Sequence, residues 1–321
     1  MLGIKTSIVV ALLSLLINGA SAAGCNTGSV ERAAQNNKQT KNRSATPSPS
    51  PIERENVNSE IKILGQGAHN QVRESFVAVA RDTQTYQELR RLDDNLPILG
   101  ADAFKRIAVV AAFLGQRRTG GFGIEITRAA DGTVRIAESS PPQRSMTTQA
   151  LTTPYKVVSV PIENERALKL DLGPTWRASL RPYRITSGEF TMSGGFAGRS
   201  ENFRLEGSFN VMREGSLATF IYDIKSAGGT KARELKEATT GIVKGNGEAS
   251  LARFNAGSLV EPPANLLGAK GQFTKNESDL NLSFESLPST VADGYQGKGR
   301  LTATATAPPP PKKALTTQDV M

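Results

Sequence analysis

Short runs in which apolar and polar residues alternate dominate the middle of the chain, and this pattern is typical of half-buried β-strands. The run at 122–126 alternates strictly, and Asp131-Gly132 then predicts a two-residue hairpin turn before the next run. Residues 76–80 and 107–113 are almost wholly apolar, and 155–161 adds another strand. Because the second of these runs is apolar on both faces, we expect it to be a central strand.

One segment of the same region departs from strand periodicity. Residues 85–88 have the spacing of a capping box, and Tyr86, Leu89 and Leu92 then fall on one face of a short helix. The pattern therefore predicts an α+β body at 59–170, with one helix against an antiparallel sheet.

The C-terminal part, residues 174–307, shows short alternating runs between Gly, Asn and Ser breaks, with Asn246-Gly247 as another hairpin turn. These runs are 203–205, 217–224, 280–284 and 301–305. Residues 234–238 are expected to form one short helix. The rest predicts an all-β sandwich or small barrel, with a filled core in preference to a ligand cavity.

The N-terminal segment has the order of an export signal, which we assign to residues 1–24. Lys5 precedes an apolar stretch at 8–17, and small residues at 20–24 lead directly to Cys25. The apolar stretch is too short to span a bilayer comfortably.

Cys25 is the only cysteine of the chain, so it has no internal disulfide partner. Ala22-Ala23-Gly24-Cys25 resembles a bacterial lipobox, which implies lipid attachment at Cys25, and Asn26 after it favours the outer membrane. We therefore expect an outer membrane lipoprotein that faces the periplasm or the cell surface. The alternative is cleavage after Ala20-Ser21-Ala22, which would release a soluble periplasmic protein.

Two polar segments flank the predicted bodies. Residues 25–58 contain almost no apolar side chains and are expected to be a disordered tether, and residues 308–321 are expected to be a disordered proline-rich tail.

The charge of the chain indicates no particular partner, because 39 basic and 30 acidic residues are spread evenly over the chain. Nucleic-acid binding proteins usually carry a dense basic face, which this even charge distribution does not provide. The sequence therefore predicts no nucleic-acid partner.

Three motifs in the first body resemble the PrcB-type domain, which is named for a lipoprotein subunit of a bacterial surface protease complex. They lie at 113–126, 139–142 and 149–155, and the resemblance covers about 61–161. It implies an accessory role, in which the protein assembles or stabilises a cell-envelope protease complex without cleaving peptide bonds. The implied partner is another exported envelope protein.

The first motif contains the candidate partner-binding loop, which has two open interpretations. It can be a recognition loop, with guanidinium groups, a hydroxyl group and glycines that admit a partner's backbone. It can equally be a tight strand connection with solvated arginines and a core phenylalanine. The residues concerned are Arg117, Arg118, Thr119, Gly120, Gly121 and Phe122.

Catalytic patterns are sparse. His69 is the only histidine, there is no second cysteine, and neither a nucleophile elbow nor a phosphate loop occurs. We therefore predict a non-catalytic protein without metal or cofactor. Two alternatives remain: a small-ligand binder that uses the C-terminal body, and a carboxylate hydrolase in which Glu125 and Glu138 face each other across a hairpin.

Overall fold

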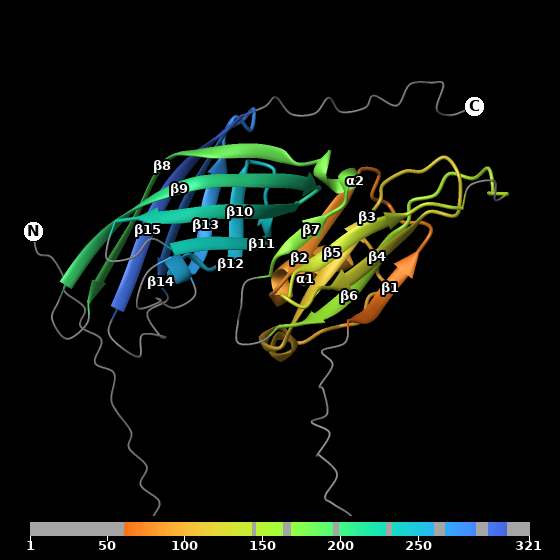
Figure 1. Ribbon diagram of the computed structural model, residues 1–321, viewed down its shortest axis with the longest axis horizontal. Coiled ribbons are helices and arrows are strands. Elements are labelled where there is room, and N and C mark those ends of the chain that lie inside the picture. Colours follow the sequence, from red (N-terminus) through yellow and green to blue (C-terminus); the bar gives the residue numbers. More distant parts are fainter. Residues whose placement is uncertain are drawn as a thin grey trace, which may run out of the picture. The chain divides into compact units, whose positions relative to one another are not determined.

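Antiparallel strands make up most of the part of the chain that the structure describes, as the alternating pattern predicts (Figure 1). The computed structural model describes residues 61–142, 146–162, 168–194, 199–228, 233–259, 267–286 and 295–306, all within one compact unit, Glu55–Met321. The export signal, Cys25, the tether at 25–58 and the tail at 308–321 lie outside the described residues.

The N-terminal body contains a four-stranded antiparallel sheet in the order β1-β6-β3-β2. Its strands are β1 (Lys62–Gly67), β2 (Phe76–Ala80), β3 (Ile107–Phe113) and β6 (Tyr155–Pro161). β3 pairs with both β2 and β6 and is almost fully buried. The prediction of a central strand at 107–113 is therefore confirmed.

One α-helix, α1 (Thr83–Arg90), follows β2, and a 3-10 helix, η1 (Ala101–Lys105), precedes β3. The predicted capping box at 85–88 is wrong, because the N-cap is Asp82, whose carboxylate accepts a hydrogen bond from the Thr85 backbone N–H at 2.8 Å. Tyr86 and Leu89 lie on the buried face as predicted. No described helix is long and apolar enough to cross a membrane.

A separate three-stranded sheet completes this body, in the order β4-β5-β7. β4 (Gly123–Arg128) and β5 (Val134–Ser139) form the predicted hairpin, but its connection is longer than the two predicted residues, because Arg128 pairs with Val134 and residues 129–133 lie between them. Gly132 in this connection has a φ of 83°. β7 (Leu170–Leu172) then pairs with β5 in parallel, and α2 (Pro174–Arg177) follows. Trp176 of α2 is fully buried, and its indole N–H donates to the carbonyl of Phe113 at 2.9 Å.

The C-terminal part is a closed eight-stranded barrel, so of the two predicted all-β folds the barrel is confirmed. Its strands in chain order are β8 (Arg181–Gly194), β9 (Arg199–Glu214), β10 (Leu217–Ala227), β11 (Arg233–Val243), β12 (Glu248–Phe254), β13 (Leu267–Phe273), β14 (Asp279–Ser286) and β15 (Tyr295–Ala305). A 3-10 helix, η2 (Ala256–Leu259), follows β12. The short helix predicted at 234–238 is wrong, because these residues lie in β11 and pair with β10.

Apolar side chains fill the inside of the barrel. Phe190, Phe254 and Phe284 are at most 3% exposed, and the ring of Phe284 packs against both of the others at centroid distances of 5.8 and 5.1 Å. These packed side chains form part of the hydrophobic core of the barrel.

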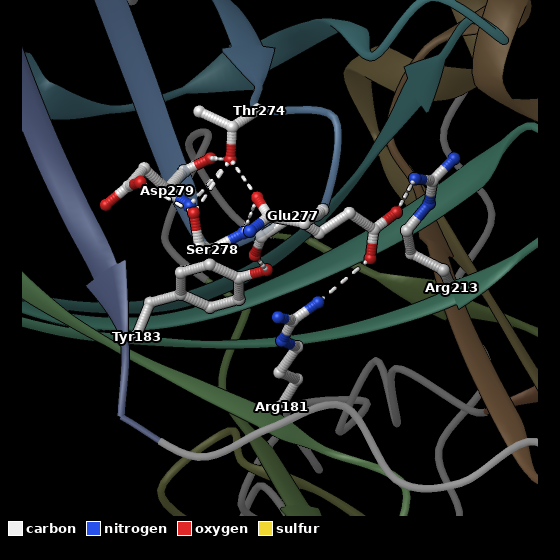
Figure 2. Close-up of polar contacts among 8 residues, drawn as sticks. Arg181, Tyr183, Arg213, Thr274, Glu277, Ser278 and Asp279 are labelled. Atoms are coloured by element: carbon white, nitrogen blue, oxygen red, sulfur yellow. Dashed lines mark hydrogen bonds and ion pairs between the residues drawn. The ribbon is translucent and has the colours of Figure 1, made fainter.

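Figure 2 shows a polar cluster in the turn between β13 and β14. Glu277, which has a positive φ of 55°, accepts hydrogen bonds from Arg181 at 3.1 Å and from Arg213. Tyr183 donates its hydroxyl proton to the Glu277 carbonyl at 2.8 Å. Since a left-handed backbone is unusual for glutamate, these contacts from β8 and β9 stabilise the turn.

Side chains of the barrel satisfy the edge of the four-stranded sheet. The backbone N–H groups of Val77 and Val79 donate to the sulfur of Met212 at 3.1 Å and to the hydroxyl of Thr240 at 2.6 Å. The hydroxyl of Thr219 donates to the Val77 carbonyl. The edge strand β2 is therefore engaged by β9, β10 and β11 and is protected against pairing with foreign strands.

Candidate functional site

Two neighbouring loops bring the three sequence motifs together. One loop, 114–122, joins β3 to β4, and the other, 140–154, joins β5 to β6; we call them the loop pair. Arg117 and Thr152 exchange two backbone hydrogen bonds of 2.7 and 2.9 Å, and the Gly120 N–H donates to the Thr148 carbonyl at 3.0 Å. The motifs are thus distant in sequence and bonded to each other in space.

Arg117, the first residue of the candidate loop, is bound within the loop pair. Its guanidinium donates to both carboxylate oxygens of Glu138 at 3.2 Å and to the Leu114 carbonyl at 2.8 Å. It also lies 5.7 Å from the centre of the half-buried Phe122 ring, a cation–π distance. Only 20% of its side chain is exposed, so Arg117 fixes the shape of the loop.

Glu138 links this arginine to α2. Burial raises the pKa of Glu138, but the hydrogen bonds from Arg117 and Thr175 and the charge of Arg117 outweigh burial, and the net pKa lies below the ordinary 4.5. The Thr175 hydroxyl donates to the same carboxylate. The ion pair therefore ties the first loop, β5 and α2 to one another.

Removing this arginine provides a pH-dependent test. Arg117→Ala is expected to lower the free energy of unfolding by about 1–2 kcal/mol near neutral pH, because a charged hydrogen-bonding partner of Glu138 is lost. Since the pKa of Glu138 is lowered, this stabilisation is complete above pH 4.5 and is lost as the pH falls through the lowered pKa. Urea unfolding at pH 7 and pH 3 checks this, and an equal cost at both would contradict it.

Gly120 and Gly121 allow the two loops to approach closely. A Cβ on Gly120 would lie 2.5 Å from the Thr148 hydroxyl, and one on Gly121 would lie 2.9 Å from Pro141. Gly121 also has a backbone φ of 87°, a value that residues other than glycine rarely adopt. At these positions and at Arg117 the structure has the features of a tight strand connection, while partner binding by the loop stays a prediction.

The outer surface of the loop pair combines apolar and charged side chains. Met146 is fully exposed and Leu151 is 51% exposed, and Arg118 is exposed on the other loop. Large apolar side chains are otherwise exposed in the described structure only at Ile63 and Ile98. Binding residues of proteins commonly lie on loops that a rigid scaffold positions.

The predicted carboxylate pair is wrong. In the β4–β5 hairpin Glu138 lies opposite Ile124, whereas Glu125 lies opposite Ala137. The two carboxylates therefore point to different faces of the hairpin, because neighbouring residues of a strand alternate in direction. His69 is exposed, as expected for a loop residue, and no cluster of three or more potential metal ligands occurs among the described residues.

Two hollows of the barrel are lined by residues of β8 and of β12–β15. They measure about 580 and 680 Å³ and share Glu189, Lys270, Ser283 and Arg300 in their linings. The linings combine polar and apolar groups, and Arg300 binds Glu189 at 2.6 Å across the strands.

Several residues that shape the loop pair escape sequence reasoning. Thr175 and the Arg117–Glu138 pair are joined only by the tertiary fold, so no local pattern marks them. Met146 and Leu151 carry a weak signal, since both are isolated large apolar residues in an otherwise polar loop.

The fold defines a class of β-rich protein in which a sheet-and-helix body carries the loop pair and adjoins a closed barrel. The family model described as PrcB C-terminal matches residues 108–161, which run from β3 through β6 and include both loops. The resemblance of the three motifs to the PrcB-type domain is thereby confirmed. No curated protein and no solved structure matches the chain.

Proposed function

We propose that the protein is a non-catalytic accessory component of the cell envelope that binds an exported protease through the loop pair. The observation that carries this proposal is that the PrcB C-terminal match, residues 108–161, includes both loops of the loop pair. The loops have an internally bonded backbone and present Arg118, Met146 and Leu151 outward. A prearranged surface of this kind limits the entropy lost on binding.

Capture of the complex tests the proposal. Membranes are solubilised in mild detergent, the protein is captured through a tag after Met321, and bound proteins are identified. We expect an exported protease at near-equal abundance with the wild type and at least tenfold less with Met146→Ser/Leu151→Ser, because truncated interface anchors weaken binding by about 1–2 kcal/mol each.

The matched control is Ile63→Ser/Ile98→Ser, which removes the other two exposed apolar side chains and leaves the loop pair intact. This variant should retain the protease. Loss of the protease from both variants, or capture of none by the wild type, would contradict binding through the loop pair.

We also propose a lipid anchor at Cys25, which the lipobox-like sequence before this residue supports. Cys25→Ser is expected to abolish incorporation of labelled palmitate and to move the protein from the membrane fraction to the soluble periplasmic fraction. Mass spectrometry of the mature N-terminus checks the cleavage site. A wild type that begins at Ala23 and carries no lipid would support the soluble alternative instead.

A further inference from the structure

A charged side chain of the N-terminal body lies buried against the barrel. Arg81 follows the last residue of β2 and is 1% exposed. Its guanidinium forms an ion pair with the carboxylate of Glu237 on β11, whose side chain is 0% exposed. A charged pair removed from water to this degree requires close complementarity between its partners.

The barrel supplies the acidic half of this site. Glu237 lies opposite Tyr222 in the register of β11 and β10, and the Tyr222 hydroxyl donates to the second carboxylate oxygen at 3.0 Å. The Tyr222 ring packs against Phe209 and Phe254 inside the barrel, at centroid distances of 5.9 and 5.3 Å. The carboxylate therefore faces the aromatic interior, with one oxygen bound by a phenol and the other by Arg81.

Arg81 reaches the carboxylate of Glu237 at a part of β11 that has no described backbone pairing with β12. The described register between the two strands pairs Ile242 with Ser250 and Val243 with Ala249, near the end of β11. Glu237 lies closer to the start of β11, outside these pairs. Leu168, which precedes β7, occupies part of the same edge, since its carbonyl accepts from the Ala238 N–H at 2.7 Å.

The chemistry of the site matches a guanidinium group. A planar guanidinium can donate to a carboxylate and still pack its faces against aromatic rings, and it is more weakly hydrated than an ammonium. Burial raises the pKa of Glu237, whereas the Arg81 charge and hydrogen bonds from Tyr222 and the Leu168 backbone lower it. A cation here therefore offsets part of the cost of burying the carboxylate.

We propose that the barrel contains a guanidinium-binding site, formed by Glu237 and Tyr222 at the seam between β11 and β12, which the chain fills with its own Arg81. The site is a property of the barrel, and it accepts a free guanidinium compound when Arg81 is removed. This inference does not depend on the proposed envelope partner.

Chemical rescue tests the proposal. Arg81→Ala removes a group equivalent to N-ethylguanidine, so N-ethylguanidinium is the probe and N-ethylammonium at the same ionic strength is the control. At ten times its dissociation constant, the probe should raise the unfolding midpoint of the variant by roughly 3 °C and leave the wild type unchanged. N-ethylammonium should have no comparable effect.

If Arg81→Ala does not fold, the test remains decisive. The readout is then the yield of folded protein on refolding in the presence of each compound. Arg81→Ala/Glu237→Gln should lose the selective response. Equal effects of the two compounds, no effect of either, or rescue that persists in the double variant would overturn the proposal.

Discussion

Arg81→Ala is expected to lower the free energy of unfolding by about 3–5 kcal/mol, because the variant leaves Glu237 buried without its cation. Both side chains are almost fully inaccessible to water, and the pair joins β11 to the residue after β2. Urea unfolding followed by the fluorescence of Trp176, the only tryptophan, measures the change.

The control replaces both charges with apolar side chains of similar size. Arg81→Met/Glu237→Leu should recover most of the lost stability, since neither variant residue leaves a buried charge behind. A double variant as unstable as Arg81→Ala would show that shape, and not the uncompensated carboxylate, causes the loss. A cost of Arg81→Ala below about 1 kcal/mol, the range of exposed ion pairs, would contradict the buried pair itself.

Trp176→Ala is expected to cost about 3–5 kcal/mol, the usual range for a large buried aromatic side chain. Trp176 is 0% exposed and belongs to the core cluster of the N-terminal body. Its indole N–H also donates a hydrogen bond to the carbonyl of Phe113, the last residue of β3. Circular dichroism must report the unfolding of this variant, because its fluorescence is lost.

Trp176→Phe separates the two contributions of this side chain. It keeps most of the apolar volume but removes the indole N–H that donates to the Phe113 carbonyl, so we expect a smaller cost of about 1–3 kcal/mol. Equal destabilisation by Phe and Ala would show that the hydrogen bond dominates. Little effect of either would contradict a core position for the indole.

The strands were predictable where one feature of the local pattern dominates. The run at 107–113 is apolar on both faces and becomes the buried β3. Asp131-Gly132 lies in the connection of the β4–β5 hairpin, which spans 129–133. The error at 234–238 has a physical reason. Glu, Leu, Lys and Ala favour helices in isolation, but pairing with β10 and burial of Leu235 and Glu237 override this preference.

The site was predictable only in part. The motifs identify the residues of the loop pair, but not that Arg117 is bound by Glu138, whose carboxylate also accepts a hydrogen bond from Thr175. Glu138 looked like a partner of Glu125 because spacing in the sequence does not fix the register of a hairpin. The Arg81–Glu237 pair joins residues that are 156 positions apart, and both are ordinary surface residue types until the fold buries them.

Site-specific photo-crosslinking in cells tests most directly whether the loop pair contacts an envelope partner. A benzoylphenylalanine placed at Leu151 should crosslink to one exported protease, whereas the same group at Ile98, which is also exposed, should not. We expect a single adduct from Leu151, which is absent without irradiation and is identified by mass spectrometry. No adduct from Leu151, or the same adduct from Ile98, would contradict this expectation.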